Sequence, residues 1–418
     1  MAFQSIWADS ASAAPTFASL DDSLRCDALV IGGGFQGLSA ALHLAEAGTD
    51  VVLVEAQEPG FGASGRNGGQ VIPGLKDDPD TLDRLWGPEA TAFAAGTADT
   101  LFALVARLGI DCDAVQGGWI QAGNRHVHLP VLQARMRQWQ ARGVAAGWLD
   151  AAAMAQVTGA SGFLGGWRDP RAGRVHPLKL ARGLAQAAEA AGVRVFARTP
   201  VTDLMRSSAG WQARLPGGAQ ITADQVILAS NVYTPAALEP RLARATVPAN
   251  SFQVATAPLS ANQLNRILPG GEVVSEVRRV GTYFRRGPDN RLMMGGRGSF
   301  ADPQRAEAFA RIEAELTRVF GERFEITHRW FGKVGMTPDH RIRLCKPAPG
   351  LLAATGFNGR GVALSVSLGK AMADHLAQGL PLPIPSSPTI PNLPFHALHR
   401  IYGGLGIQYY RLRDALDR

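Results

Sequence analysis

Three glycines and one glutamate near the start of the chain have the types and spacing of a dinucleotide-binding turn. Gly32, Gly34 and Gly37 read G-x-G-x-x-G, and Glu55 ends the next apolar run. In such a turn the first glycine permits a tight bend, the second lets a pyrophosphate approach the backbone, and the third lets the helix pack on the sheet. The helix N-terminus favours phosphate, and Glu55 would accept hydrogen bonds from ribose hydroxyls.

A second glycine-rich stretch indicates which dinucleotide is bound. Residues 60–70 read GFGASGRNGGQ and follow directly after the acid-bearing strand. A flavin bound in extended form needs chain running beside it, and bare backbone N–H groups can reach its pyrophosphate and its ring edge. The cofactor is therefore expected to be FAD.

A third glycine motif stands before the last long helix. Residues 356–361 read GFNGRG between an apolar run and that helix. The positive end of the helix dipole would then face the flavin pyrimidine edge, which becomes anionic on reduction.

Helices and strands must hold these motifs in place. The runs 26–31 and 50–55 are typical of buried parallel strands, and 36–47 has helical spacing, so together they predict one βαβ unit. Further helices are expected at 88–108, 129–142, 177–191, 302–320 and 361–378. Further strands are expected at 163–168, 193–198, 253–256, 280–294 and 351–355.

Composition excludes several other classes of protein. The chain has 418 residues, 46% of them hydrophobic, which is enough for a sizeable core. Its net charge of +7 comes from scattered arginines without a basic run, so we expect no nucleic-acid partner. Three widely separated cysteines predict neither a disulfide framework nor a metal site. No basic leader and no apolar run of membrane-spanning length is seen, so we expect a cytoplasmic protein without stable membrane insertion.

Five stretches resemble the glycine oxidase/D-amino-acid oxidase superfamily of FAD-dependent oxidoreductases, and particularly γ-glutamylputrescine oxidase-like proteins with their GASGRNGGQ loop. The resemblance covers roughly residues 5 to 378. The stretches are IGGGFQGLSAALHLAEAG, VVLVEAQEPGFGASGRNGGQ, GRVHPLKLARGLAQAAEAAGVRVF, QVILASNVYTP and LLAATGFNGRGVALSVSLGK.

This resemblance implies an α/β fold: an FAD-binding Rossmann-type domain and a substrate domain built on a mixed antiparallel sheet. The interleaved elements assign residues 25–75, 150–245 and 325–378 to the FAD-binding domain, 76–149 and 246–324 to the substrate domain, and 379–418 to a Pro-rich connector and C-terminal helix. The implied FAD-binding residues are Gly32, Gly34, Gln36, Gly37, Glu55, Ala56, Ser64, Gly65, Arg66, Asn67, Gly68, Gly69, Gln70, Val201, Asn358, Gly359, Arg360, Gly361 and Val362.

Departures from related families bear on linkage and electron acceptor. Where sarcosine oxidase has a flavin-linked cysteine this chain has Gly332, and where dimethylglycine dehydrogenase-like proteins have a linking histidine it has Arg66, so FAD is expected to be non-covalent. Sarcosine oxidase also uses a lysine to promote oxygen reduction, and Met293 stands in its place. Lys333 is the candidate for this oxygen-activating role, and a purely structural role for Lys333 is the equally favoured alternative.

The substrate site is less determined. Lys333, Tyr283 and Arg286 are the candidate catalytic residues, and Arg285 and Arg297 are further candidates for holding a substrate carboxylate. The predicted reaction oxidises the CH–NH bond of an amine or amino acid to an imine, with O2 as acceptor and H2O2 as product. Two alternatives remain: a dehydrogenase that passes electrons to a quinone or carrier, and a non-catalytic FAD-binding sensor.

Overall fold

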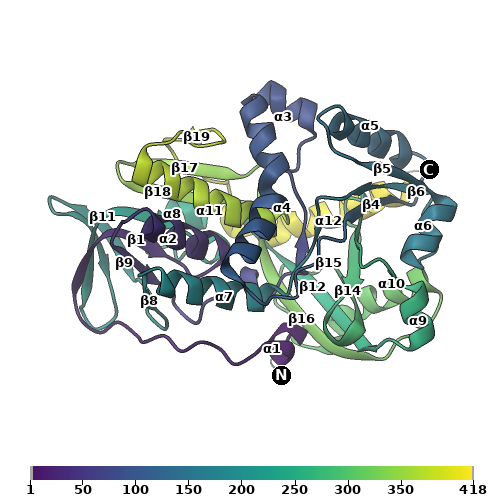
Figure 1. The fold of residues 1–418 in the computed structure, drawn as a ribbon, viewed down its shortest axis with the longest axis horizontal. Helices are drawn as coiled ribbons and strands as arrows, with labels where there is room; N and C mark the ends of the chain where they lie inside the picture. The colour runs from purple at the N-terminus through teal and green to yellow at the C-terminus, as the bar shows by residue number, and fades with distance from the viewer. Residues whose placement is uncertain (1–2, 417–418) are drawn as a thin grey trace.

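Two large β-sheets lie side by side in the computed structural model, which describes residues 3–416 (Figure 1). The first sheet has nine strands: β1 (Leu24–Ile31), β2 (Val51–Val54), β8 (Arg194–Phe196), β9 (Asp203–Ser207), β10 (Gly210–Arg214), β11 (Gln220–Leu228), β17 (Arg343–Ala348), β18 (Leu351–Thr355) and β19 (Ser386–Ser387). Their order is β19-β17-β18-β11-β1-β2-β8, and the hairpin β9–β10 pairs with β11.

The centre of the first sheet is parallel and covered on both faces. Strands β8, β2, β1, β11 and β18 are parallel neighbours, and β2 is buried along its whole length. Helices cover one face and the β9–β10 hairpin packs on the other, which is how a parallel sheet excludes water. The covering helices are α2 (Phe35–Glu46), α4 (Pro88–Leu108), α7 (Pro177–Ala190) and α11 (Gly361–Gln378).

The second sheet has eight strands in the order β16-β12-β15-β14-β13-β4-β6-β5. They are β4 (Trp119–Gly123), β5 (Gly147–Asp150), β6 (Gly165–Asp169), β12 (Val247–Pro258), β13 (Val273–Glu276), β14 (Thr282–Arg286), β15 (Arg291–Arg297) and β16 (Ile326–Met336). All its pairs are antiparallel except β13 with β4. The predicted fold class, α/β with a second domain on a mixed antiparallel sheet, is confirmed.

Eight further helices and a small sheet complete the described part of the fold. The helices are α1 (Ile6–Ser10), α3 (Pro79–Trp86), α5 (His128–Gln140), α6 (Ala151–Thr158), α8 (Pro240–Ala243), α9 (Ala261–Arg266), α10 (Ala310–Phe320) and α12 (His399–Leu416). The small sheet pairs β3 (Gln70–Val71) with β7 (Gly173–Arg174).

Strand pairing and helix packing place three segments in another sheet's domain than expected. Residues 325–336 were expected in the FAD-binding domain, but β16 pairs with β12 from Ile326 to Met336 and so belongs to the second sheet. The same holds for β6, which was expected after the boundary at residue 150. Helix α4 was expected in the substrate domain, yet Ala94, Ala98 and Leu101 lie in the core of the first sheet. Local sequence patterns cannot show which sheet a strand joins, because pairing partners lie far away in the chain.

Two predicted elements differ in detail. The stretch 280–294 is a hairpin rather than one strand, because the chain turns at Asp289 and Asn290, both with positive φ. The helix expected from residue 302 begins at Ala310, after a 3₁₀ turn over Ala306–Phe309.

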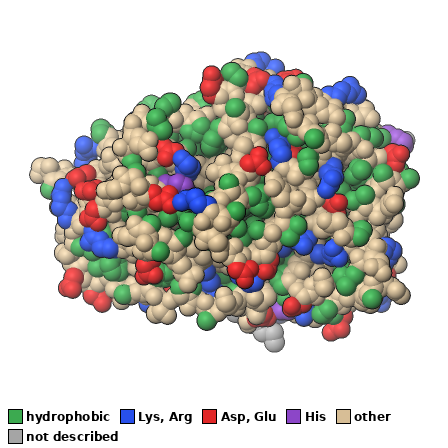
Figure 2. Space-filling view, in the orientation of Figure 1, with side chains coloured by type: hydrophobic (Ala, Val, Ile, Leu, Met, Phe, Trp, Pro, Cys, Tyr) green, Lys and Arg blue, Asp and Glu red, His purple; other side chains and the backbone are tan. Residues whose placement is uncertain are grey.

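The C-terminal helix α12 packs near the second sheet (Figure 1). It buries Ile407, while Asp414 accepts hydrogen bonds from the backbone of Arg279 and Val280. Within residues 3–416, no helix combines the length and the apolar character that crossing a membrane requires. On the face seen in Figure 2, basic and acidic side chains are intermixed rather than gathered into a basic stripe.

Candidate functional site

The dinucleotide turn is built as its glycines require. Gly32 has φ of +116°, and a Cβ on Gly37 would lie 2.0 Å from the Gly32 carbonyl oxygen, so only glycine fits there. Glu55 accepts hydrogen bonds from the backbone N–H of Gly33 at 2.7 Å and of Gln57 at 3.0 Å. Its carboxylate thus stands beside the turn, and burial raises the pKa of Glu55 above its usual value.

The loop 60–70 folds back onto this turn. The Gly60 N–H donates to the Gly33 carbonyl at 2.9 Å, and the Ser64 hydroxyl accepts from the Phe35 N–H at 3.0 Å, at the N-terminus of α2. Asn67 braces the loop from within: its amide donates to the Ala63 and Ser64 carbonyls and accepts from the Gly69 N–H. The two sequence motifs therefore form one structural unit.

Indole and guanidinium groups from elsewhere anchor the same loop. Trp330 on β16 donates to the Arg66 carbonyl at 3.0 Å, and Trp7 on α1 donates to the Asn67 carbonyl at 2.9 Å. The buried Arg285 donates to the Gly69 carbonyl at 2.7 Å and lies over the Trp7 ring. These anchors were not predicted, since Trp7 and Trp330 are separated from the loop by about 60 and 260 residues.

Three neighbouring cavities that share lining residues lie along the loop, and together they are called the channel here. The first, about 130 Å³, begins at Gly34 and Gln36; the second, about 140 Å³, shares Ala63 and Asn67 with it. The third, about 230 Å³, shares Tyr283, Ser251 and four further residues with the second and extends over the second sheet. Gly359 lines all three.

These residues fit an extended dinucleotide. Gly359 has φ of +82° and open space where a Cβ would stand. The side-chain amide oxygen Oε1 of Gln36 is buried and lacks a hydrogen-bond partner among residues 3–416, and Gln36 lines the channel. A hydroxyl-bearing ligand in the channel would satisfy it.

The turn before α11 closes the channel from the other side. Asn358, with φ of 51°, accepts from the Thr337 N–H at 2.8 Å and donates to the Gly356 carbonyl. The helix begins at Gly361 without a side-chain cap, and Gly361 and Val362 line the channel. The N-terminus of α11, which carries the positive end of the helix dipole and has no capping side chain, therefore borders the channel. This is the place expected for the flavin pyrimidine edge.

The chamber over the second sheet collects charged groups. Lys76, Arg297 and Arg360 line it together with Glu276, and no carboxylate lies within 4.0 Å of the three cations among residues 3–416. The Lys76 side chain is exposed and lines the chamber, with protein atoms crowded around it. Burial, and then the neighbouring arginines, lower the pKa of Lys76 to about 7.

Most predicted site residues meet along this channel. Tyr283 lines it, with its hydroxyl 2.7 Å from the Ser251 hydroxyl, and burial raises the pKa of Tyr283 to about 12. Lys333 lines it as well, 3.4 Å from an Asp302 carboxylate oxygen. Val201 is buried in the core beside the first sheet.

Three predicted or compared residues lie elsewhere. Arg286 lines none of the described cavities; its guanidinium donates to the Pro269 carbonyl at 3.1 Å, because its strand position points it away from the channel. The Arg285 guanidinium already donates hydrogen bonds to the backbone carbonyl oxygens of Gly69 and Val175. Met293 is buried against Trp7 and Trp330 in the core.

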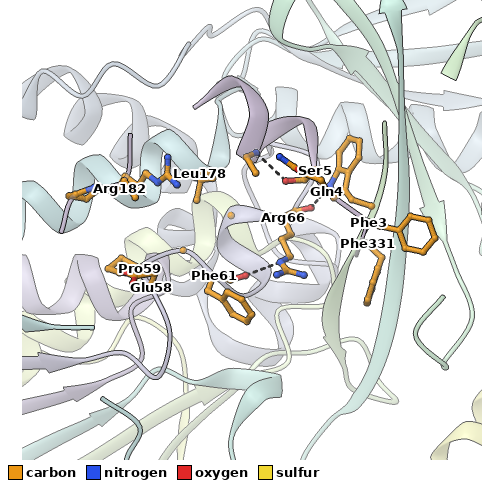
Figure 3. Close-up of a pocket in the computed structure, with 16 residues that line it drawn as sticks. Phe3, Gln4, Ser5, Glu58, Pro59, Phe61, Arg66, Leu178, Arg182 and Phe331 are labelled. Carbon is orange, nitrogen blue, oxygen red and sulfur yellow. Dashed lines mark hydrogen bonds between the residues drawn. The ribbon is translucent and has the colours of Figure 1, made fainter. Parts of the chain in front are cut away.

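The Arg66 guanidinium lies against Phe61, although Arg66 also lines the second cavity. It donates to the Phe61 carbonyl at 2.9 Å and lies over the Phe61 ring at 4.7 Å. Figure 3 shows it in a separate cavity of about 300 Å³, with Phe3, Leu178, Arg182 and Phe331 around it. The Arg66 backbone remains part of the loop, but its guanidinium is held by Phe61 rather than by the channel.

The sequence prediction missed Lys76 and Glu276. Lys76 is one of only five lysines and lies six residues beyond the glycine loop, which was a usable signal. Glu276 had none, because its place in the chamber depends on the pairing of β13 with β14 and β4.

Known proteins similar to this chain share both its sequence and its fold. Residues 27–375 match the protein family described as FAD dependent oxidoreductase. The chain is 32% identical over 425 residues to the gamma-glutamylputrescine oxidoreductase of Escherichia coli strain K12, covering 99% of this chain and 98% of that protein. It is 31% identical to the probable oxidoreductase OrdL of Rhizobium meliloti, over 96% of this chain and 95% of that one.

Solved structures of similar fold include enzymes named for different electron acceptors. Glycine oxidase from Geobacillus kaustophilus has a TM-score of 0.74 and 22% identity, covering 88% of this chain and 98% of its own. L-proline dehydrogenase from P. horikoshii also has a TM-score of 0.74, with 17% identity, covering 86% and 96%. Since an oxidase and a dehydrogenase match equally well, the fold does not choose the acceptor.

Proposed function

The chain belongs to the FAD-dependent oxidoreductase family, and from this premise we propose that it oxidises the CH–NH bond of an amine to an imine, with O2 as acceptor and H2O2 as product. The observation that carries the proposal is the row of adjoining cavities from the dinucleotide turn to a charged chamber at Tyr283. A sensor that only retained FAD would have no need for a further chamber of about 230 Å³ next to the cavities at the glycine motifs. The E. coli relative acts on γ-glutamylputrescine by its name, so acylated diamines of polyamine catabolism are the first substrates to try.

The bound FAD would supply the acceptor for the hydride that leaves the substrate carbon. The residues of the turn and loop, from Gly32 to Glu55 and from Ser64 to Gln70, would hold its adenosine and pyrophosphate without a covalent link. The N-terminus of α11 would stabilise the charge that develops on reduction.

The chamber residues would position the amine and keep water out. Tyr283 stays a neutral phenol, because burial raises its pKa to about 12, and it therefore does not act as a base. Its hydroxyl, held by the Ser251 hydroxyl at 2.7 Å, would form a hydrogen bond that orients the amine. Positioning supplies much of the rate, and the imine is hydrolysed by water after release. Lys333 is proposed as the cation that assists oxygen reduction, from its place on the channel.

An anaerobic substrate screen tests this function. Purified FAD-loaded protein is mixed with polyamines, acylated diamines and both enantiomers of amino acids, and the visible flavin band is followed. Bleaching by an amine supports catalysis, and no bleaching by any of them would leave the sensor alternative.

Admitting air then separates the two acceptors. Rapid recovery of the band with H2O2 formation supports the oxidase, whereas slow recovery in air and rapid recovery with a quinone would establish the dehydrogenase. Acid precipitation should release all the FAD, and flavin retained in the pellet would contradict non-covalent binding.

A further inference from the structure

Trp7, on the short helix α1, is completely buried and lies behind the glycine loop. Its side chain is 0% exposed, and its indole N–H donates to the Asn67 carbonyl oxygen at 2.9 Å. Trp7 lines none of the three cavities of the channel, whereas Asn67 lines two of them. The Asn67 carbonyl is therefore directed into the protein core and away from the channel.

Ring contacts fix Trp7 in this orientation. The Trp330 ring lies edge-on to it with the centroids 6.1 Å apart, and the His176 ring does so at 4.8 Å. The Arg285 guanidinium lies over the Trp7 ring at 5.2 Å. Because these three side chains are themselves buried, the packing of the core sets the direction of the indole N–H, and the loop must fit to it.

The Asn67 carbonyl depends on this one donor. The preceding carbonyl, that of Arg66, accepts from the Trp330 indole at 3.0 Å and from the Gln253 amide at 2.8 Å. The Asn67 carbonyl accepts from Trp7 alone among residues 3–416. Removal of one indole would therefore leave the Arg66 carbonyl with a partner and the Asn67 carbonyl with none.

The N–H group of the same peptide unit faces the other way. The C=O and N–H of a trans peptide point to opposite sides, so the Gly68 N–H is directed away from Trp7. Gly68 lines the second cavity, and a Cβ on it would lie 2.7 Å from the Tyr283 ring. Its N–H has no hydrogen-bond partner within residues 3–416. An unused donor in the wall of a cavity is suited to an acceptor atom of a bound ligand.

We propose that Trp7 is a positioning residue of the cofactor site: its indole holds the Asn67 carbonyl in the core and thereby directs the Gly68 N–H toward a carbonyl oxygen of the flavin ring. Without the indole N–H, the Asn67 carbonyl would be buried without a partner, and the peptide unit would turn it toward the channel. The cavity would then present an acceptor in place of a donor. This role depends on the FAD of the family and not on the amine reaction.

The test is the midpoint potential of the bound flavin in Trp7→Phe, measured anaerobically against a reference dye. Reduction increases the negative charge on the carbonyl oxygens of the ring, so a donor at such an oxygen favours the reduced form. Loss of the donor should disfavour the reduced form about tenfold, which lowers the potential of this two-electron couple by about 30 mV. An unchanged potential would overturn the proposal.

Two other tryptophans separate positioning from loss of packing. Trp330→Phe also removes a buried indole, but the Arg66 carbonyl keeps its second donor, so the potential should fall by less than in Trp7→Phe. Trp211→Phe removes an indole that donates to a backbone carbonyl beside the first sheet, away from the loop, and should leave the potential as in wild type. Equal shifts in all three variants would assign the effect to lost packing and reject the proposal.

An isosteric replacement keeps the test decisive if Trp7→Phe loses FAD or fails to fold. Benzothienylalanine, incorporated at position 7 alone, has a sulfur atom in place of the indole N–H and nearly the same shape. It removes the donor and retains the packing, so the potential should fall by about as much as expected for Trp7→Phe. A wild-type potential with this residue would overturn the proposal whatever the behaviour of Trp7→Phe.

Titration of apoprotein identifies the part of the cofactor that the donor meets. ADP contains the adenosine and pyrophosphate but lacks the ring, so Trp7→Phe should weaken FAD binding several-fold and leave ADP binding unchanged. Equal weakening of both would place the donor at the pyrophosphate and reject its assignment to the ring. None of these measurements uses a substrate, so an enzyme that no amine reduces would defeat the proposed function and leave this result standing.

Discussion

The two ends of the channel differ in whether their polar side chains have hydrogen-bond partners in the protein. At the nucleotide end, Glu55, Ser64 and Asn67 are all hydrogen-bonded to neighbouring backbone. At the chamber end, Lys76 and Glu276 Oε1 lack hydrogen-bond partners within residues 3–416. The nucleotide end is therefore preformed by its own chain, whereas these two polar groups of the chamber are not satisfied by the chain.

Arg285 shows that burial alone does not explain the difference. It is 3% exposed, only a few residues from the chamber, yet it donates to the carbonyls of Gly69, Val175 and Arg286. Its pKa is lowered to about 9 by burial, but its donors have partners. The chain thus satisfies the buried Arg285 with its own carbonyl groups, whereas the exposed Lys76 has no such partner among residues 3–416.

The largest expected effect tests the preformed end. Gly37→Ala places a methyl 2.0 Å from the Gly32 carbonyl oxygen, so the turn must open. We expect a loss of unfolding free energy at the upper end of overpacking effects, about 3 kcal/mol, together with loss of FAD. Thermal unfolding and the flavin absorbance of the purified variant measure both.

The matched control for that substitution is Gly96→Ala in α4, where a Cβ meets nothing within 4 Å. It should raise stability by about 0.5–1 kcal/mol, because alanine loses less entropy than glycine in a helix. Equal destabilisation by both substitutions would remove the special role of the turn.

Removing the Glu55 carboxylate is the next largest change. Glu55→Ala should weaken FAD binding by about 1–3 kcal/mol, because the ribose and the N–H groups of Gly33 and Gln57 lose their acceptor. Equilibrium titration of apoprotein with FAD gives the change in Kd. Glu58→Ala, which breaks a surface pair with Arg198, should leave it within about 0.5 kcal/mol. Retention of FAD unchanged in Glu55→Ala would place Glu55 outside the site.

Lys333 lies between the two ends and tests the acceptor. Lys333→Met should slow flavin reoxidation by O2 more than about tenfold, or about 1.4 kcal/mol, because a nearby cation stabilises superoxide as it forms. Reduction by substrate should change little, as stopped-flow mixing can show. Lys370→Met, which removes a lysine paired with Asp374 on α11, is the control. If reoxidation is fast and unaffected, Lys333 is structural.

The smallest expected effect is a pH dependence of carboxylate binding at the chamber end, caused by Lys76. Lys76 is faced by Arg360 before α11, Arg297 on β15, Arg135 on α5 and His340 after β16, and its pKa is lowered to about 7. A lowered pKa means that Lys76 carries its charge below about pH 7 and loses it above, so carboxylate binding should weaken as pH rises.

The Kd of N-glutarylbutylamine measures this, since the ligand does not titrate between about pH 6 and 9. We expect a several-fold rise in Kd for wild type and a flat profile for Lys76→Met. The same slope in the variant would assign the pH dependence to another group.

Much of the nucleotide end could be predicted from the sequence. The glycine spacing, the acid at Glu55 and the buried strands around them are local patterns, and their chemistry resides in the backbone, which neighbouring residues determine. The loop 60–70 and the turn 356–361 were recognised for the same reason, and the family resemblance they carry is confirmed. The position of the Arg66 guanidinium beside Phe61 could not be predicted, because a loop motif fixes the backbone position but not the side-chain rotamer.

The chamber was decided by tertiary structure alone. Its charged groups come from the segment after the glycine loop, from β13, from β15 and from the turn before α11. Whether a strand residue such as Arg286 or Arg297 faces the chamber depends on register, since a shift of one residue reverses every side chain. Register follows from the pairing of β14 with β15 and of β12 with β16, which join residues about 10 to 90 positions apart. By itself the sequence therefore determined the cofactor and the glycine motifs expected to bind it, because these are local patterns. The pairing of the second sheet determined which side chains line the chamber next to them.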